Sequence, residues 1–175
     1  MAASWRTILA AAFAALLAGA AGAGRTAPAP RMAITSFAQL PTPLPLPYDP
    51  GADARAQVAA AKARAAAAHK LLLIDLGGDW CPDCRILAAT IEQPDLKAFV
   101  QTHYEVVTVD VGFLDKNLDI PARYGISGRL EGVPSLLIID PRTDALLDRG
   151  HIAALADARH MTPQALADWL AKWTP

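Results

Sequence analysis

Cysteine is scarce in the 175-residue chain, which has only Cys81 and Cys84. A zinc site built on them would need further ligands from four histidines, none of which is paired at a ligand spacing. We therefore expect no metal site. Neither sign of charge is in excess, because 16 Lys and Arg side chains stand against 17 Asp and Glu. Since no basic surplus exists to neutralise phosphates, we expect no nucleic-acid partner.

Long hydrophobic runs are also missing. The apolar stretch 7–17 is shorter than the roughly 20 residues that span a bilayer. It follows the charged side chain of Arg6 and precedes small residues that fit a cleavage site. These features predict a signal peptide at residues 1–23, with an uncleaved membrane anchor as the alternative. In either case we expect an exported domain, and the alanine-rich signal favours the periplasm.

Residues 24–48 form a proline-rich segment. Four prolines alternate with other residues in 41–47, which favours an extended backbone over helix or sheet. The pattern predicts a linker that acts as a tether. A packed arm on the domain surface is the alternative, because several apolar side chains could be buried. They are Phe37, Leu40, Leu44, Leu46 and Tyr48.

Residues 49–175 are predicted to form a single α/β domain. Continuous apolar runs indicate strands that are covered on both faces. Strands are predicted at 71–76, 104–111, 135–140 and 145–149. Helices are predicted at 53–69, at 85–102 with a bend at Pro94, and at 163–173 with Thr162 as N-cap. This order of elements is that of a small α/β sandwich.

The two cysteines lie in a Trp-Cys-Pro-Asp-Cys motif between a buried strand and a predicted helix. A thiolate at a helix N-terminus meets unpaired amides and the positive end of the dipole, which lowers its pKa. The spacing places the second sulfur one turn further along the same helix. We therefore expect Cys81 to attack and Cys84 to resolve. A purely structural disulfide is the alternative, but so short a loop would stabilise the fold little.

The sequence resembles the thioredoxin superfamily over about residues 69–175. The resemblance depends on several motifs in a fixed order. They are the apolar strand with Asp75, the Trp80–Cys84 motif, Val109-Asp110, Tyr124-Gly125-Ile126, and Gly132-Val133-Pro134-Ser135. It implies a thioredoxin-like three-layer sandwich, in which helices flank a central mixed β-sheet.

The resemblance also implies roles for residues outside the cysteine motif. Pro134 would be a cis-proline facing the cysteines, with Val133 offering its backbone to the substrate; an ordinary trans-proline is the alternative. Asp75 would lie behind Cys84 and move its proton, unless it is a satisfied carboxylate at the strand end. Members of the family often place a lysine near this carboxylate. Here that position is Val106, so we expect the pKa of Asp75 to be higher.

The other motif residues are expected to contact substrate. Trp80 and Pro82 would shape the docking surface beside the cysteines, together with Asp83. A carboxylate roughly 7 Å from the sulfur opposes the thiolate by up to about 2 kcal/mol. That is comparable to the most a helix N-terminus supplies, so Asp83 leaves the thiolate pKa undecided. Asp83 could equally be an acid of the first helical turn that only favours the dipole.

The leading hypothesis is an exported thiol–disulfide oxidoreductase that reduces disulfides in other exported proteins. It would use no cofactor beyond the redox-active Cys81–Cys84 pair, act as a monomer, and draw electrons from a membrane protein. A thiol oxidant or isomerase using the same cysteines is the second hypothesis, because the reduction potential of the pair sets the direction of electron flow. The third is a non-enzymatic binding module. The loop 127–131 is a candidate for partner selection, with a plain surface turn as the alternative.

Overall fold

The computed structural model describes residues 26–175, and the predicted signal peptide at 1–23 lies outside them. A four-stranded mixed sheet runs through the middle of the fold in the order β2-β1-β3-β4. The strands are β1 (Leu71–Gly77), β2 (Tyr104–Asp110), β3 (Ser135–Asp140) and β4 (Ala145–Leu146). β1 is parallel to β2 and antiparallel to β3, and β4 is antiparallel to β3.

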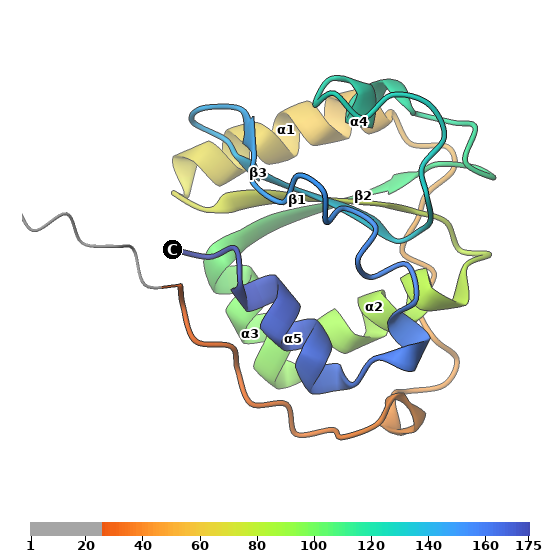
Figure 1. The fold of residues 1–175 in the computed structure, drawn as a ribbon, viewed down its shortest axis with the longest axis vertical. Coiled ribbons are helices and arrows are strands. Elements are labelled where there is room, and N and C mark those ends of the chain that lie inside the picture. Colours follow the sequence, from red (N-terminus) through yellow and green to blue (C-terminus); the bar gives the residue numbers. More distant parts are fainter. Residues whose placement is uncertain (1–25) are drawn as a thin grey trace, which may run out of the picture.

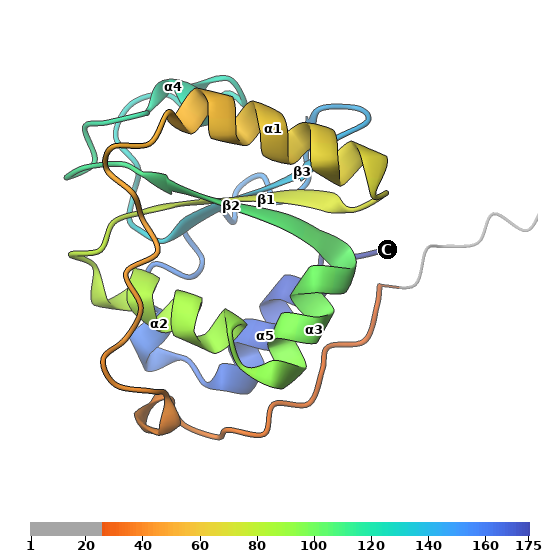
Figure 2. The same cartoon turned by 180° about the vertical axis from the view of Figure 1, so that it is seen from behind.

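Helices cover both faces of the sheet (Figures 1 and 2). On one face lie α1 (Ala54–Ala67) and α4 (Asp119–Ala122). On the other lie α2 (Pro82–Ile91), α3 (Pro94–His103) and α5 (Pro163–Ala171). Two 3-10 helices, η1 (Phe37–Gln39) and η2 (Ala158–His160), complete the set. The predicted three-layer α/β sandwich is confirmed, and none of the helices within residues 26–175 is long and apolar enough to cross a membrane.

The apolar run of β1 is continuous because both of its faces are buried. Leu72, Ile74 and Leu76 belong to the cluster beneath α1, whereas Leu73 belongs to the cluster beneath α3 and α5. All four side chains are fully buried. Burying such a side chain contributes roughly 1.5–3 kcal/mol. The strand therefore fixes the sheet, and with it the position of the loop that follows Gly77.

Strand register brings three chain segments to one edge of the sheet. Gly77 at the end of β1 pairs with Asp110 at the end of β2, and Leu76 pairs with Ser135 at the start of β3. The cysteine motif follows β1, and Pro134 immediately precedes β3. The topology thus places the cysteines and Pro134 at the same edge.

The single bent helix predicted at 85–102 is instead two helices. α2 ends at Ile91, and α3 begins with Pro94 as its first residue. Proline has no amide hydrogen and clashes with the preceding turn of a helix. At the first position of a helix there is no preceding turn, and the backbone amide makes no hydrogen bond within the helix, so proline fits there. The fourth strand is also shorter than predicted.

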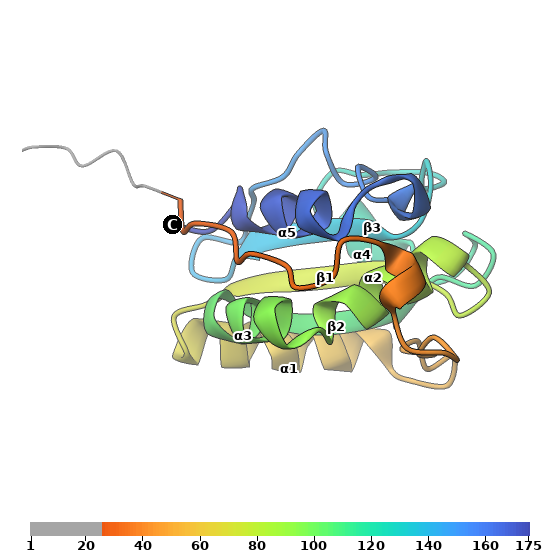
Figure 3. The same ribbon diagram turned by 90° about the horizontal axis from the view of Figure 1, so that it is seen from below.

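From residue 26 onward the proline-rich segment is a packed arm, which was the alternative to a linker, so the prediction of a linker at 24–48 is corrected. Its backbone runs along α5 and α3, passes α2 and reaches α1 (Figures 2 and 3). Met32, Leu40 and Tyr48 are buried. Arg85 of α2 donates to the carbonyls of Leu44 at 2.9 Å and Pro45 at 3.2 Å. Extended backbone leaves its carbonyls free, so side chains of the domain can bind them.

Candidate active site

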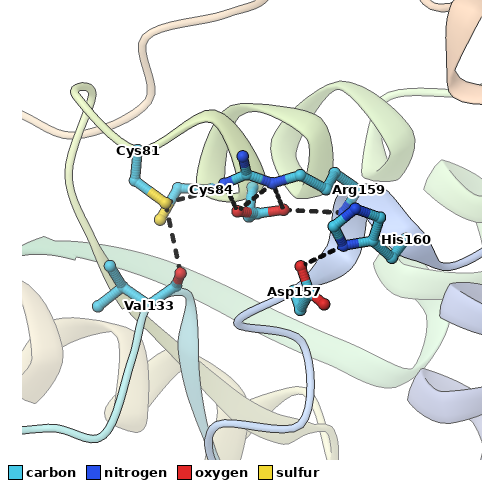
Figure 4. Close-up of polar contacts among 7 residues, drawn as sticks. Cys81, Cys84, Val133, Asp157, Arg159 and His160 are labelled. Atoms are coloured by element: carbon cyan, nitrogen blue, oxygen red, sulfur yellow. Dashed lines mark hydrogen bonds and ion pairs between the residues drawn. The ribbon is translucent and has the colours of Figure 1, made fainter.

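Cys81 is the N-cap of α2 and Cys84 lies in the first turn, both as free thiols. The Cys81 side chain is 4% exposed and the Cys84 side chain is completely buried. The backbone amide of Cys84 donates to Cys81 Sγ at 3.4 Å. Cys81 Sγ in turn donates to the carbonyl of Val133 at 3.3 Å (Figure 4). The site is thus assembled between a helix start and the loop before β3.

The two thiols differ in acidity. The hydrogen bond with Cys84 lowers the pKa of Cys81 to about 6, with help from the amides of Cys84 and Asp83 and against the effect of burial. The hydrogen bond with Cys81, together with burial, raises the pKa of Cys84. Only a thiolate is nucleophilic, so at neutral pH the outer sulfur is prepared to attack and the inner one keeps its proton.

The loop opposite the cysteines contains Val133 and Pro134, joined by a cis peptide bond. Both residues are buried, and the Val133 carbonyl faces the sulfur of Cys81 (Figure 4). This contact joins positions 52 residues apart in the sequence. The structure thus brings the predicted backbone element to the nucleophilic sulfur.

Asp75 lies on β1 behind the cysteines and is 2% exposed. Burial raises its pKa to about 7, although a hydrogen bond from Tyr48 lowers it in part. Tyr48 Oη donates to Asp75 Oδ1 at 2.9 Å. A carboxyl group with this pKa can take up or release a proton near neutral pH.

Tyr48 is a site residue that sequence reasoning did not assign. A β-carbon added at Gly77 would collide with Tyr48 Oη and lie 2.7 Å from Cys84 Sγ. The hydroxyl and the inner sulfur therefore border the same small space above Gly77. The sequence marked Tyr48 only as a side chain that could be buried, and nothing in it connects the arm to Asp75.

Asp83 is buried and clamped by Arg159, which neither interpretation of the sequence anticipated. It is 2% exposed. Arg159 Nε lies 3.1 Å from Oδ1 and 3.0 Å from Oδ2, and Nη2 also donates to Oδ2. Burial raises the pKa of Asp83, but the hydrogen bonds from Arg159 outweigh it and hold the pKa below its ordinary value. The carboxylate between the cysteines is thus ionised and paired.

An exposed aromatic pair borders the motif. Trp80 is 45% exposed and Phe113 is 72% exposed, and their rings stack with centroids 5.4 Å apart. Trp80 Nε1 donates to the carbonyl of Gly112 at 2.7 Å, which holds the indole in place. Pro82 is the first residue of α2 and is exposed beside them. Sequence reasoning included Trp80 and Pro82 but missed Phe113, which lies in a loop without a recognisable motif.

Ser127 and residues 129–131 of the loop line a pocket of about 700 Å³ together with residues 149–154. Neither cysteine lines this pocket, nor does Val133. Its role in partner selection stays a prediction. In the part of the chain from residue 26 onward, no three His, Cys, Asp or Glu side chains lie together as they would around a metal ion.

Comparison with known proteins identifies the family to which this site belongs. The model of a thioredoxin-like family matches residues 53–141, which contain both cysteines, Asp75 and Pro134. The chain belongs to the thioredoxin-like family. Together with the two free thiols at the start of α2 and with the disulphide isomerase relative reported next, this match assigns the protein to the thiol–disulfide oxidoreductases.

A solved relative agrees with the assignment to the thioredoxin-like family. A disulphide isomerase from Xylella fastidiosa Temecula1 is 36% identical in sequence, with a TM-score of 0.67. The match covers 74% of this chain and 97% of that one. A protein of unknown function from Pseudomonas aeruginosa is 22% identical over 69% of this chain, with a TM-score of 0.38. None of the curated proteins matches the chain.

Proposed function

We propose that this protein reduces disulfides in exported proteins by dithiol exchange through Cys81 and Cys84. The observation that carries the proposal is the arrangement of the two thiols at the start of α2. The Cys81 sulfur caps the helix and accepts from the Cys84 amide, which lowers its pKa, whereas the Cys84 thiol is fully buried, which raises its pKa. A reductase needs one sulfur ionised before substrate arrives and a second sulfur that stays protonated until a mixed disulfide exists. The pair at the start of α2 meets both requirements.

The reaction proceeds in two exchanges. The Cys81 thiolate attacks one sulfur of the substrate disulfide, the S–S bond breaks, and the first substrate thiolate leaves. Cys84 then loses its proton, and its sulfur attacks Cys81 Sγ in the mixed disulfide. The second substrate thiolate leaves, and a Cys81–Cys84 disulfide forms. Two electrons have passed from the protein to the substrate.

Asp75 is proposed to take the proton of Cys84, and Tyr48 supports it. The Tyr48 hydroxyl donates to Asp75 and borders the space beside Cys84 Sγ. The hydroxyl can accept the thiol proton while passing its own to Asp75, so that one proton moves in total. With a pKa of about 7, Asp75 is ionised in a large share of molecules at neutral pH.

The substrate chain is proposed to bind across the loop before β3 and the aromatic pair. In the mixed disulfide its sulfur is bonded to Cys81 Sγ, which lies 3.3 Å from the Val133 carbonyl. Val133 and Pro134 would therefore contact the adjoining residues of the substrate. Trp80 and Phe113 offer an apolar surface next to them, and Pro82 and the buried Asp83 shape the rim. Exposed aromatic side chains are enriched where proteins bind partners.

The proposed setting is the periplasm, with a membrane protein as electron donor. Each turnover leaves the cysteines oxidised, so a reductase in an oxidising compartment requires a source of electrons. No further cofactor is proposed, because thiol–disulfide exchange needs only sulfur. The protein is proposed to work as a monomer and without nucleic acid.

An isomerase is the second candidate function, and one observation favours it. The Xylella fastidiosa relative is described as a disulphide isomerase.

The reduction potential of the Cys81–Cys84 pair decides between these functions. The purified protein is equilibrated with glutathione or dithiothreitol, and its thiols are counted by alkylation. A value near −270 mV, as in thioredoxin, supports the reductase; about −180 mV indicates an isomerase and about −120 mV an oxidant.

A trapping experiment tests whether the protein is an enzyme at all. A Cys84→Ser variant retains the nucleophile but cannot resolve, so it should accumulate mixed disulfides with protein substrates through Cys81. A binding module would keep its partners without such adducts. Cys81→Ser is the matched control and should trap nothing.

A further inference from the structure

The Asp83–Arg159 pair connects the cysteine motif to a distant part of the chain. The two residues are 76 positions apart, and η2 brings Arg159 to the start of α2 (Figure 4). The backbone amide of Arg159 donates to Asp83 Oδ1 at 2.8 Å, in addition to the side-chain contacts. Nearly half of the Arg159 side chain is exposed, whereas that of Asp83 is 3% exposed.

This arrangement compensates a charge that would otherwise oppose the reaction. The charge of Asp83 raises the pKa of Cys81. An unpaired carboxylate in a buried place acts strongly on a neighbour, because little water screens it. Arg159 supplies a positive charge through a fork of hydrogen bonds, the geometry that holds a carboxylate most firmly. The charge of Cys81 also acts directly on Arg159 and raises the pKa of its guanidinium group.

We propose that Arg159 is a positioning residue for the redox pair: by neutralising the buried Asp83, it preserves the thiolate of Cys81 and so tunes the reduction potential. The inference rests on the proposed function. The titratable and charged groups that act on Cys81 are Cys84, Asp75, Asp83 and Arg159. Of these, Arg159 carries the sole positive charge.

The test uses two single substitutions that change the local charge in opposite directions. Arg159→Gln removes the positive charge but leaves the backbone amide to hold Asp83. The pKa of Cys81 should rise by about one unit, and at pH 8 the equilibrium with glutathione should shift roughly tenfold toward the disulfide, or about 30 mV. Asp83→Asn removes the negative charge, so the Cys81 pKa should fall and the equilibrium should shift the other way. The double variant should return close to the original values.

The pKa is measured from the pH dependence of iodoacetamide alkylation, which needs no protein substrate. Arg142→Gln is the control, because Arg142 pairs with Asp140 at the opposite end of β3 from Pro134, and it should change neither quantity. If the Asp83–Arg159 pair only stabilised the structure, both single variants would shift the Cys81 pKa and the reduction potential in the same direction, or would leave the potential unchanged. Either result would overturn the proposal. If Arg159→Gln does not fold, the predicted fall in Asp83→Asn decides the question.

Failure of the proposed function would look different. Absence of mixed disulfides in Cys84→Ser would refute exchange with protein substrates, yet the opposite pKa shifts of the two charge variants would still be observed. Loss of the opposite shifts with normal trapping would refute only the role of Arg159.

Discussion

Tyr48 Oη lies 2.9 Å from Asp75 Oδ1, a buried contact between the N-terminal arm and the central strand. Residues 26–48 thus supply a group that touches Asp75, the proposed proton acceptor for Cys84. A segment whose composition suggests a spacer is therefore part of the redox site. The contact has a direct kinetic consequence.

Substitution of Tyr48 by Phe should slow resolution of the mixed disulfide. Loss of the hydroxyl removes a hydrogen bond that lowers the pKa of Asp75, and that pKa should rise by about one unit. Fewer Asp75 carboxylates are then ionised at pH 7, so resolution should be at least about fivefold slower there, and this part of the loss should recover at higher pH. Stopped-flow kinetics of the second exchange measure this. Tyr104→Phe is the control, since Tyr104 donates to Leu170 instead; equal slowing in both variants would contradict the prediction.

Substitution of Arg85 by Ala should also slow resolution of the mixed disulfide, because it loosens the arm that contains Tyr48. Arg85 holds the arm through the carbonyls of Leu44 and Pro45, and a hydrogen bond from a charged donor contributes about 1.5–3 kcal/mol. The arm should open more often, which hydrogen exchange at the Tyr48 amide would report as reduced protection. Arg64→Ala, which breaks an exposed ion pair with Glu105, should leave that protection unchanged. Unaltered protection in Arg85→Ala would refute this role.

Substitution of Phe113 by Ser should impair binding of protein substrates and spare the chemistry. Phe113 is exposed and stacked on Trp80, so its removal takes away apolar contact area without opening the core. We expect KM for a disulfide-containing protein to rise several-fold, with kcat and the Cys81 pKa unchanged. Leu147→Ser removes another exposed apolar side chain, near Leu71 at the far end of the sheet, and should change neither constant. A fall in kcat for Phe113→Ser would show that the residue does more than bind.

Stability should fall as pH rises from about 4 to 7, because two buried acids have raised pKa values. Burial raises the pKa of Asp148 to about 6 and that of Asp75 to about 7. The folded state therefore binds protons that the unfolded chain releases near pH 4. The stability they provide is complete below that pH and is lost as pH passes the folded pKa.

Asp148→Asn tests this most directly. Asp148 is fully buried; its Oδ1 accepts from the Ile138 amide at 3.0 Å, and its Oδ2 has no partner. Removing the titration should flatten the pH dependence by on the order of 2 to 3 kcal/mol between pH 4 and 8. Urea unfolding of the reduced protein at both pH values measures it. Asp49→Asn, at an exposed position, should leave the slope as it is.

Features that depend on residues close together in the sequence were predictable. The apolar run of β1 indicated a strand covered on both faces, and the cysteines between a strand and a helix indicated a nucleophile at a helix start. α5 begins as expected, with Thr162 as N-cap and Pro163 as first residue. In each case the signal lies within one element and needs no knowledge of tertiary contacts.

Features that depend on contacts between residues far apart in the sequence were not predictable. The charge of Asp83 was visible, but its partner Arg159 lies 76 residues away in a short 3-10 helix without a motif. Tyr48 could be expected to be buried, yet only the path of the arm around α2 brings it to Asp75. Two interpretations of the arm remained open because alternating prolines fix an extended backbone without stating what lies beside it.

The segment matched by the thioredoxin-like family model begins at residue 53 and ends at residue 141. It contains the cysteines, Asp75 and Pro134, but neither Tyr48 nor Arg159. The residues proposed to perform the exchange thus lie in the matched segment. Tyr48, which donates to Asp75, and Arg159, which pairs with Asp83, come from its two flanks. Proteins with the same motif but different flanks are expected to differ in potential and pH optimum, so a terminal extension can adapt one redox centre to different substrates.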